Sequence, residues 1–356
     1  MKCGLLYGPD IHHLDHLAPL CHILDIPLCV TEEAIAKRAN ECYPHLEIIL
    51  CDHVQLPIFI LERFELVLTS LPKPLFREIF FFAEQILKKK AHTLWCPHGN
   101  SDKGHSHSFW EALREEEMIL LYGKQMFDAM QAEGILDKVP GHVITGNYRW
   151  EFYRSYLSFY HLLVEREIRS RLPPAKRTIL YAPTWLDASQ SSSFFDALPI
   201  LVDLLPADQN LIVKPHPNLM LAHPTRTSLL IEQFSSHPRL LFLEEFPPIY
   251  PLLDIADVYI GDMSSVGYDF LTFDRPLFFL NQHEKKNAYL FRTGIEISKA
   301  NYEHLYNVID EFFAFELRDF SALRKEVYTY AFGHPKSLDM LRKEIEAMIS
   351  TAIKLL

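Results

Sequence analysis

The sequence predicts an α/β protein of two domains, each built around a parallel sheet. The chain has 356 residues, about twice the length of a common single domain. Short apolar runs alternate with amphipathic stretches, a pattern typical of strands that are buried on both faces and joined by helices. This rhythm is interrupted at Pro173-Pro174. Because a residue before proline resists helical geometry, we expect the hinge between the domains near 171–177.

The expected elements follow this rhythm along the chain. Apolar runs predict strands at 3–8, 27–31, 46–52, 65–70, 92–99, 118–123 and 142–147, and then at 177–185, 210–217, 239–245, 257–262 and 275–280. A long aromatic-rich helix is expected at about 148–172. The last helix, at about 335–354, places Leu341, Ile345, Met348 and Ile349 on one apolar face. The expected domains are therefore 1–172 and 173–334, with a terminal helix in 335–356.

Composition limits the possible partners. The net charge of −11 argues against a broad nucleic-acid-binding face, which would need clustered Lys and Arg. No apolar stretch approaches the roughly 20 residues that span a bilayer, and the first residues lack the apolar core of a signal peptide. We therefore expect a cytoplasmic protein whose contact with the inner membrane face is peripheral at most.

Metals and redox cofactors are not expected. His12 and His16 have the i,i+4 spacing of a metal pair, but no neighbouring motif completes a site. No G-x-G-x-x-G fingerprint follows the first predicted strand, which argues against a nicotinamide or flavin cofactor. The six cysteines form no C-x-x-C pair and lie mostly in apolar runs, so we interpret them as small buried hydrophobic residues.

Four predicted strand ends carry polar residues that suit phosphate chemistry. The most specific is Asp262 followed by Ser264 and Ser265 at a helix start, where free amides and the helix dipole attract an anion. The alternative is that the serines only cap the helix. A second strand ends in Pro183-Thr184.

The other two strand ends carry histidines. Lys214 and His216 have the same parity, so along a strand they would share one face and could stabilise a pyrophosphate or protonate a leaving group. His98 precedes a glycine and could accept a proton from an attacking hydroxyl group. The alternatives are a proline-rich surface turn and a turn histidine.

Five motifs in order between residues 95 and 280 resemble the CDP-glycerol glycerophosphotransferase family, the teichoic-acid primases and polymerases of the glycosyltransferase-B fold. They are Pro97-His98-Gly99 with Lys103, Gly146-Asn147-Tyr148-Arg149, Tyr181-Ala182-Pro183-Thr184-Trp185, Lys214-Pro215-His216-Pro217, and Asp262-Met263-Ser264-Ser265 with Tyr268-Asp269. Four positions depart from the family pattern: Pro97 replaces Trp, Tyr148 replaces Pro, and Leu186 and Lys214 each replace Arg. Lys214 keeps the charge but loses the guanidinium fork.

The resemblance implies a fold and a reaction. The fold would be two Rossmann-like domains facing a cleft, the first on the acceptor side and the second binding the nucleotide donor, with the terminal helix returning to the first. An acceptor hydroxyl of an envelope glycan or lipid would attack the β-phosphorus of a CDP-linked polyol and release CMP. The scheme requires neither a metal nor a cofactor.

The same resemblance assigns roles to individual residues. His98 would act as the general base, and His216 with Lys214 would stabilise the pyrophosphate. Ser264 and Ser265 would hold phosphate oxygens at the helix start. Further donor contacts are implied for Lys103, Arg149 and Thr184, and loop orientation or ribose binding for Asp262 and Asp269.

Other functions stay open. A glycosyltransferase of the same fold would use a nucleotide sugar. A nucleotide-sugar epimerase should place carboxylates in the cleft, whereas the candidates here are mostly His, Ser and Lys. A non-catalytic nucleotide-binding relative would be expected to lose His98 or His216, and both are present. The nucleotide that is released distinguishes these classes.

Overall fold

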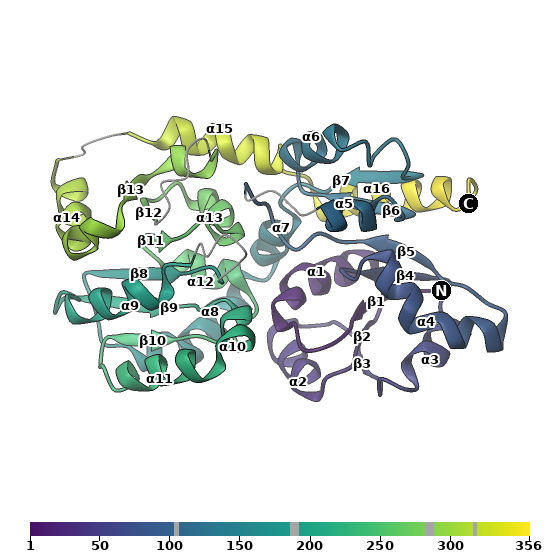
Figure 1. The fold of residues 1–356 in the computed structure, drawn as a ribbon, viewed down its shortest axis with the longest axis horizontal. Helices are drawn as coiled ribbons and strands as arrows, with labels where there is room; N and C mark the ends of the chain where they lie inside the picture. Colours follow the sequence, from purple (N-terminus) through teal and green to yellow (C-terminus); the bar gives the residue numbers. More distant parts are fainter. Residues whose placement is uncertain (103–106, 186–191, 282–287, 316–318) are drawn as a thin grey trace. The chain divides into compact units, whose positions relative to one another are not determined.

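The chain folds into two compact units. A computed structural model describes residues 1–102, 107–185, 192–281, 288–315 and 319–356. Unit 1 comprises residues 1–99, 104–155 and 330–356, and unit 2 comprises residues 100–103 and 156–329. Each unit has one sheet in which every strand pair is parallel, surrounded by helices (Figure 1). The predicted class, two α/β domains with parallel sheets, is confirmed.

Unit 1 contains a seven-stranded sheet in the order β3-β2-β1-β4-β5-β6-β7. Its strands are β1 (Lys2–Leu6), β2 (Leu28–Val30), β3 (Ile48–Leu50), β4 (Leu66–Thr69), β5 (His92–Trp95), β6 (Met118–Leu121) and β7 (Gly141–Ile144). Its helices are the short 3₁₀ turn η1 (Ile11–His13), α1 (Leu14–Leu24), α2 (Glu33–Cys42), α3 (Leu56–Arg63), α4 (Lys73–Leu87), α5 (His107–Leu113), α6 (Lys124–Ala132), α7 (Tyr148–Ser155) and α16 (Leu338–Ala352).

Unit 2 contains a six-stranded sheet in the order β10-β9-β8-β11-β12-β13. Its strands are β8 (Arg177–Ala182), β9 (Gln209–Val213), β10 (Leu240–Phe242), β11 (Val258–Gly261), β12 (Leu277–Leu280) and β13 (Ile295–Ile297). Its longer helices are α8 (Leu157–Glu167), α9 (Phe194–Asp203), α10 (Pro217–Ala222), α11 (Pro224–Phe234), α12 (Ile249–Ile255), α13 (Ser265–Phe270) and α14 (Leu305–Phe315); α15 (Ser321–Phe332) runs across the boundary with unit 1. Short 3₁₀ turns occur at η2 (Arg169–Arg171), η3 (Leu271–Phe273), η4 (Leu290–Thr293) and η5 (Lys299–His304).

Several strands end earlier than the apolar runs suggested. The run 92–99 becomes β5, which stops at Trp95, and the run 210–217 becomes β9, which stops at Val213. Pro97 and Pro215 follow two residues later and have no backbone N–H to donate to a neighbouring strand. His98 and His216 therefore lie in loops beyond the sheets. β13 was not predicted, because a three-residue edge strand carries too little pattern.

The boundary between the units lies before the predicted hinge. The expected helix at 148–172 is interrupted at Tyr156, whose φ of −124° and ψ of 28° are not helical, and the units divide between Ser155 and Tyr156. The reason is packing: α8 contacts α12 and forms part of unit 2. The Pro-Pro pair near 171–177 instead follows a stretch that already lies inside unit 2.

The last helix packs inside unit 1. α16, drawn in yellow, lies beside β7 in Figure 1 and also contacts α1 and α7. Leu341, Ile345 and Ile349 form its buried face. The close approach requires a glycine at 141, because a Cβ there would lie 2.7 Å from the sulfur of Met348.

The cysteines are buried, as the sequence predicted. All six cysteines are buried and reduced, and burial raises the pKa of Cys96 to about 12, so its thiol stays protonated. Among the residues that the structure describes, none of the helices has the length and hydropathy needed to cross a membrane.

Candidate active site

The carboxyl edge of the unit 2 sheet brings together three of the predicted motifs. β8 and β11 are neighbours, yet the chain continues from β8 towards β9 on one side and from β11 towards β12 on the other. Loops diverge at such a switch point, and ligands of open α/β sheets bind there. The loops that follow β8, β9 and β11 carry Thr184, His216 and Asp262.

Asp262 holds two of these loops in place. Its side chain is 1% exposed, and its carboxylate accepts hydrogen bonds from the backbone N–H of Thr184 at 2.9 Å and of Ser193 at 3.1 Å. Ser193 immediately precedes α9. Asp262 thus joins the end of β11 to the loop after β8 and to the start of a helix. Leu186, one of the departures from the family pattern, lies outside the described residues.

The two serines after β11 begin α13 as expected. Ser264 is the N-cap, and its hydroxyl oxygen accepts a hydrogen bond from the N–H of Val266 at 3.3 Å. Both Ser264 and Ser265 are half-buried. Ser264 therefore performs the capping role that was the alternative to phosphate binding, and the helix dipole remains directed at its N-terminal end.

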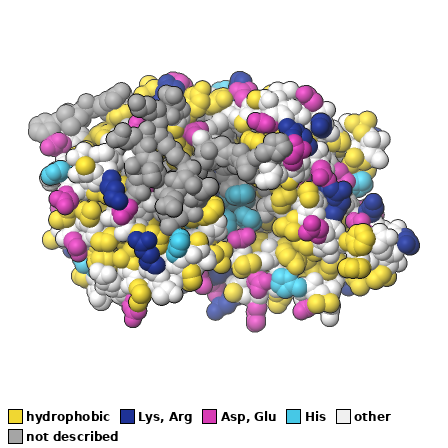
Figure 2. Space-filling view, in the orientation of Figure 1, with side chains coloured by type: hydrophobic (Ala, Val, Ile, Leu, Met, Phe, Trp, Pro, Cys, Tyr) yellow, Lys and Arg dark blue, Asp and Glu magenta, His cyan; other side chains and the backbone are white. Residues whose placement is uncertain are grey.

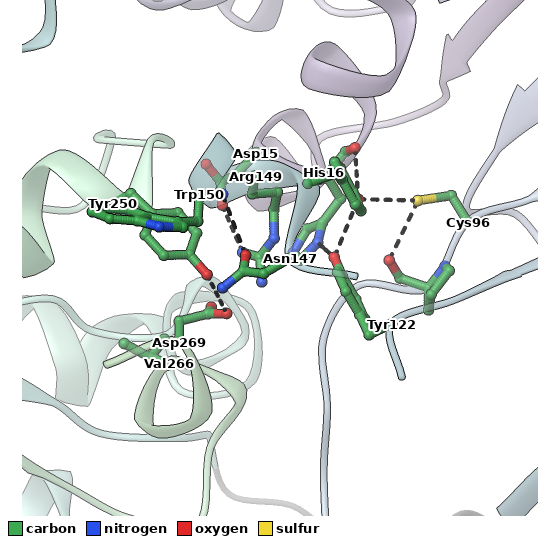
Figure 3. Close-up of polar contacts among 12 residues, drawn as sticks. Asp15, His16, Cys96, Tyr122, Asn147, Arg149, Trp150, Tyr250, Val266 and Asp269 are labelled. Atoms are coloured by element: carbon green, nitrogen blue, oxygen red, sulfur yellow. Dashed lines mark hydrogen bonds and ion pairs between the residues drawn. The ribbon is translucent and has the colours of Figure 1, made fainter. Parts of the chain in front are cut away.

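Asp269 lies further along α13 and is 3% exposed. It accepts a hydrogen bond from the hydroxyl of Tyr250 at 3.2 Å, which links α13 to α12 (Figure 3). Asp262 and Asp269 are thus positioning residues within unit 2, and direct contact of either with a nucleotide stays a prediction.

His216 lies where its ring is oriented by the backbone. It is the N-cap of α10, and its Nδ1 accepts a hydrogen bond from the N–H of Asn218 at 3.1 Å. Its ring centroid is 6.4 Å from that of Trp185. Because Nδ1 accepts this bond, the neutral ring carries its proton on Nε2, which is a hydrogen-bond donor.

Lys214 does not follow the expected strand geometry. β9 ends at Val213, so the period of two does not extend to Lys214 and His216, and a shared face cannot be derived from it. The ammonium of Lys214 donates a hydrogen bond to the carbonyl oxygen of Phe246 at 2.8 Å. Lys214 is half-buried and ties its loop to the segment after β10.

In unit 1, His98 lies in a group of polar side chains at the carboxyl edge of the sheet. The switch point here lies between β1 and β4. Ser70, just after β4, places its hydroxyl 2.9 Å from Nδ1 of His13. The ring of His98 lies 5.0 Å from that of His13 and 6.3 Å from that of His12, measured between centroids.

The environment of His98 favours its neutral form. The protein that surrounds the ring lowers its pKa by reducing hydration of the imidazolium, although His98 is exposed at the surface of unit 1, and the negative charge of Asp10 partly opposes this shift. A neutral imidazole can accept a proton at neutral pH. Gly99, which follows, has a φ of 130°, a conformation that favours glycine.

Arg149 is placed differently from the prediction. It is 3% exposed inside unit 1, its Nη1 lies 2.8 Å from Oδ2 of Asp15 on α1, and its guanidinium lies over the ring of Tyr122 at 5.2 Å (Figure 3). A buried Arg–Asp pair holds α1 and α7 together. In this structure Arg149 thus has a structural role, and its expected donor phosphate contact stays a prediction.

A buried hydrogen-bond network adjoins this pair. The hydroxyl of Tyr122 lies 2.5 Å from Nδ1 of His16 and 3.2 Å from the hydroxyl of Tyr148, which itself donates to the carbonyl oxygen of His16 at 3.0 Å (Figure 3). Burial lowers the pKa of His16 far below its ordinary value, and the charge of Arg149 lowers it further. His16 is therefore a neutral core residue.

Neither Lys103 nor a metal centre is part of the site as the described residues show it. Lys103 lies outside the described residues, so its predicted donor contact stays a prediction. Within the described ranges, no three His, Cys, Asp or Glu side chains are grouped so as to hold a metal ion.

Sequence reasoning missed Asp10, whose charge acts on His98, and Ser70, which contacts His13, and it gave His13 no role there. The signal was present as the run Pro9-Asp10-Ile11-His12-His13 directly after β1, but its proximity to the loop after β5 comes only from the strand order.

Residues 163–290 match the model of the family CDP-Glycerol:Poly(glycerophosphate) glycerophosphotransferase. The resemblance to this family is confirmed. The matched stretch contains the motifs around Thr184, His216 and Asp262, whereas His98 and Arg149 precede it. A search of the curated proteins found no match.

Solved structures share the fold of this chain. A variant of the wall teichoic acid polymerase TagF with CDPG is 11% identical with a TM-score of 0.64, covering 99% of this chain and 89% of that one. Staphylococcus aureus MnaA with UDP is 12% identical with a TM-score of 0.61, covering 100% and 97%. UDP-GlcNAc 2-epimerase from Neisseria meningitidis bound to UDP-GlcNAc is 10% identical with a TM-score of 0.55, covering 99% and 100%.

These likenesses assign the chain to the glycosyltransferase-B fold. The family match supports a transferase.

Proposed function

We propose that the chain transfers a glycerol-phosphate-type group from a CDP-activated donor to a hydroxyl group of an envelope glycan or lipid and releases CMP. The observation that carries this proposal is the family match over residues 163–290, which contain the loops at the switch point of the unit 2 sheet. The TagF variant that was solved with CDPG has the same fold.

Donor binding is assigned to unit 2. The amino end of α13 offers backbone N–H groups and a dipole to phosphate oxygens, with Ser264 and Ser265 beside them. The Nε2 proton of His216 suits a hydrogen bond to a pyrophosphate oxygen or proton donation to the leaving CMP. Lys214 adds a positive charge to the loop that holds His216. Thr184, held by Asp262, is a further donor contact in this proposal.

Acceptor activation is assigned to unit 1. His98, kept neutral by its surroundings, takes the proton of the acceptor hydroxyl while the acceptor oxygen forms its bond to the β-phosphorus. The bond between that phosphorus and the bridging oxygen breaks, and the electron pair leaves with CMP. The transfer is a substitution at phosphorus, so it requires no oxidant or reductant.

The donor class is tested by the nucleotide that is released. The purified chain is incubated with CDP-glycerol, CDP-ribitol, UDP-glucose and UDP-GlcNAc, and CMP, CDP and UDP are separated by chromatography. We expect CMP from a CDP-polyol. UDP from a nucleotide sugar would identify a glycosyltransferase instead, and interconversion of the sugar would identify an epimerase.

The histidine assignments are tested in the same assay. His98→Ala and His216→Ala should each lower turnover by roughly 10²–10⁴-fold. His237→Ala is a matched control, because Nδ1 of His237 also accepts a backbone N–H, from Arg239 at 3.3 Å, outside the proposed site. Full activity of His98→Ala would disprove its role as the base.

A further inference from the structure

The ring of His98, the proposed base, is held by no hydrogen bond within the described part of the chain. His98 is exposed, it lies in the loop after β5, and Gly99 follows it with a φ of 130°. An exposed side chain of this kind changes rotamer rapidly unless a neighbour restrains it. Proton transfer needs the accepting nitrogen at a defined position, so a histidine that acts as a base is normally oriented by a third group.

Two other imidazole rings meet the ring of His98. The ring centroid of His13 lies 5.0 Å from that of His98, with 38° between the ring planes, and the centroid of His12 lies 6.3 Å away. The rings of His12 and His13 are 4.4 Å apart in an edge-to-face arrangement. Figure 2 shows histidine side chains, in cyan, gathered on the surface where Figure 1 draws α1. His13, the nearer of the two, can restrict how the ring of His98 turns.

His13 is fixed in its turn by the end of β4. The hydroxyl of Ser70 lies 2.9 Å from Nδ1 of His13. The carbonyl oxygen of Ser70 accepts a hydrogen bond from Nε1 of Trp95, the last residue of β5, at 3.2 Å. The backbone N–H of His13 donates to the carbonyl oxygen of Asp10 at 2.9 Å in the turn before α1. His13 is thus held both at its backbone and at one edge of its ring.

The sheet of unit 1 sets the positions of these supporting residues. β4 pairs with β5, with Thr69 opposite Trp95, so strand pairing places Ser70 directly after the last paired residue. β4 also pairs with β1, which brings the segment after β1 to Ser70. His13 is therefore supported by paired strands, whereas His98 lies in a loop. Residues that are locked by packing and hydrogen bonds can keep a reacting side chain in its productive geometry.

We propose that His13, held by Ser70, is a positioning residue that orients the ring of His98 for proton transfer. His13 acts through His98 and makes no contact with the donor in this arrangement. The inference rests on the proposed function, in which His98 takes the proton of the acceptor hydroxyl. It adds two residues that lie outside the stretch matched by the family model.

Kinetics in the nucleotide-release assay test the link between His13 and His98. His13→Ala should lower kcat for CMP release from CDP-glycerol or CDP-ribitol roughly 10–100-fold and leave KM for the donor unchanged, because only the base is misplaced. Ser70→Ala keeps both rings and removes one hydrogen bond, so we expect a loss of about fivefold. His13→Phe keeps a flat ring beside His98 and should recover part of the activity that His13→Ala loses.

A double variant separates positioning from a general structural effect. Because His13 acts through His98, His13→Ala/His98→Ala should be no slower than His98→Ala alone. His22→Ala and Ser155→Ala are the matched controls, since these residues lie on α1 and α7 of the same unit, and both variants should keep full activity. Full activity of His13→Ala would overturn the proposal. So would losses that multiply in the double variant.

The order of the His98 ring, measured by NMR, tests the same contact without any substrate. The histidine rings are labelled with carbon-13, the His98 signal is identified by its loss in His98→Ala, and relaxation gives its order parameter. We expect this order parameter to fall in His13→Ala and Ser70→Ala and to stay the same in His22→Ala. An unchanged value in His13→Ala would overturn the proposal. If the chain releases no CMP but these variants lose ring order, the transferase activity is contradicted and the support of His98 by His13 is confirmed.

Discussion

The backbone N–H of Thr184 donates a hydrogen bond to Oδ2 of Asp262 at 2.9 Å, although the two residues follow different strands of the unit 2 sheet. Those strands, β8 and β11, pair in parallel and flank the switch point. The same carboxylate also accepts the N–H of Ser193. One buried acidic side chain thus fixes the loops that carry the proposed donor contacts.

Asp262 is therefore expected to act mainly through stability. Asp262→Ala should lower the free energy of unfolding by about 2–4 kcal/mol, because it leaves buried amide donors without their charged acceptor. Asp262→Asn keeps one acceptor oxygen and should lose less. Urea unfolding measures both, with the exposed Asp203→Ala on α9 as the control. If Asp262→Ala were as stable as that control and only donor binding fell, Asp262 would be a ligand contact instead.

Arg149 and Asp15 should behave as a coupled buried pair. Arg149→Met should destabilise the chain by about 3–5 kcal/mol, since it leaves the carboxylate of Asp15 buried without its partner. The double variant Arg149→Met/Asp15→Leu should recover part of that loss. Arg154 on the same helix pairs with Glu151 at the surface, so Arg154→Met should change stability by about 0–1 kcal/mol. Additive losses in a double-mutant cycle would contradict the coupling.

The lowered pKa of His98 predicts how kcat/KM falls at acidic pH. Its pKa is lowered and the base must be neutral, so kcat/KM for the CDP-polyol should stay level as pH falls towards about 6.5 and decline only below it. Asp10→Asn removes a negative charge that raises this pKa, and should shift the decline to still lower pH. Glu47→Gln, an exposed carboxylate in unit 1, is the control and should leave the profile unchanged. A shift of the limb to higher pH in Asp10→Asn would count against His98 as the titrating group.

Two neighbouring carboxylates in unit 1 should have opposite effects on stability. Burial raises the pKa of Glu116 to about 8. Burial also acts to raise the pKa of Glu117, but its hydrogen bonds with Lys73 and with the N–H of Thr93 and the charges of Lys73 and His92 together outweigh burial, so this pKa is lowered. Between about pH 4.5 and 8 the unfolded chain releases the Glu116 proton and the folded chain keeps it, so stability falls as pH rises.

Glu116→Gln should therefore stabilise the chain at pH 8 by at least about 1 kcal/mol, with a smaller gain at pH 5. The glutamine can still accept the hydrogen bond that the N–H of Lys73 donates to Glu116 at 2.6 Å. Glu117→Gln should destabilise at both pH values, because ionised Glu117 contributes stability above about pH 4.5. Urea unfolding at the two pH values compares the variants, and a loss of stability in Glu116→Gln at pH 8 would refute the assignment.

The two-sheet fold could be predicted from the sequence because its strands are buried on both faces. β6 and β12 read as continuous apolar runs, and the amphipathic stretches between strands show the helical period directly. The prolines after β5 and β9 also mark where histidines leave the sheet. Local pattern suffices for such features, because each depends on residues that are close in the chain.

Only the tertiary structure decided which of the candidate side chains form hydrogen bonds with other residues of the chain. Arg149 and Lys214 read as phosphate contacts, but Asp15 lies 134 residues from the first, and the carbonyl of Phe246 lies 32 residues from the second. Likewise, Ser70 meets His13 only because β1 and β4 are neighbours in the sheet. A polar side chain takes whichever partner the packing brings within hydrogen-bond distance, and the order of strands that sets this distance is not written in any local stretch of sequence.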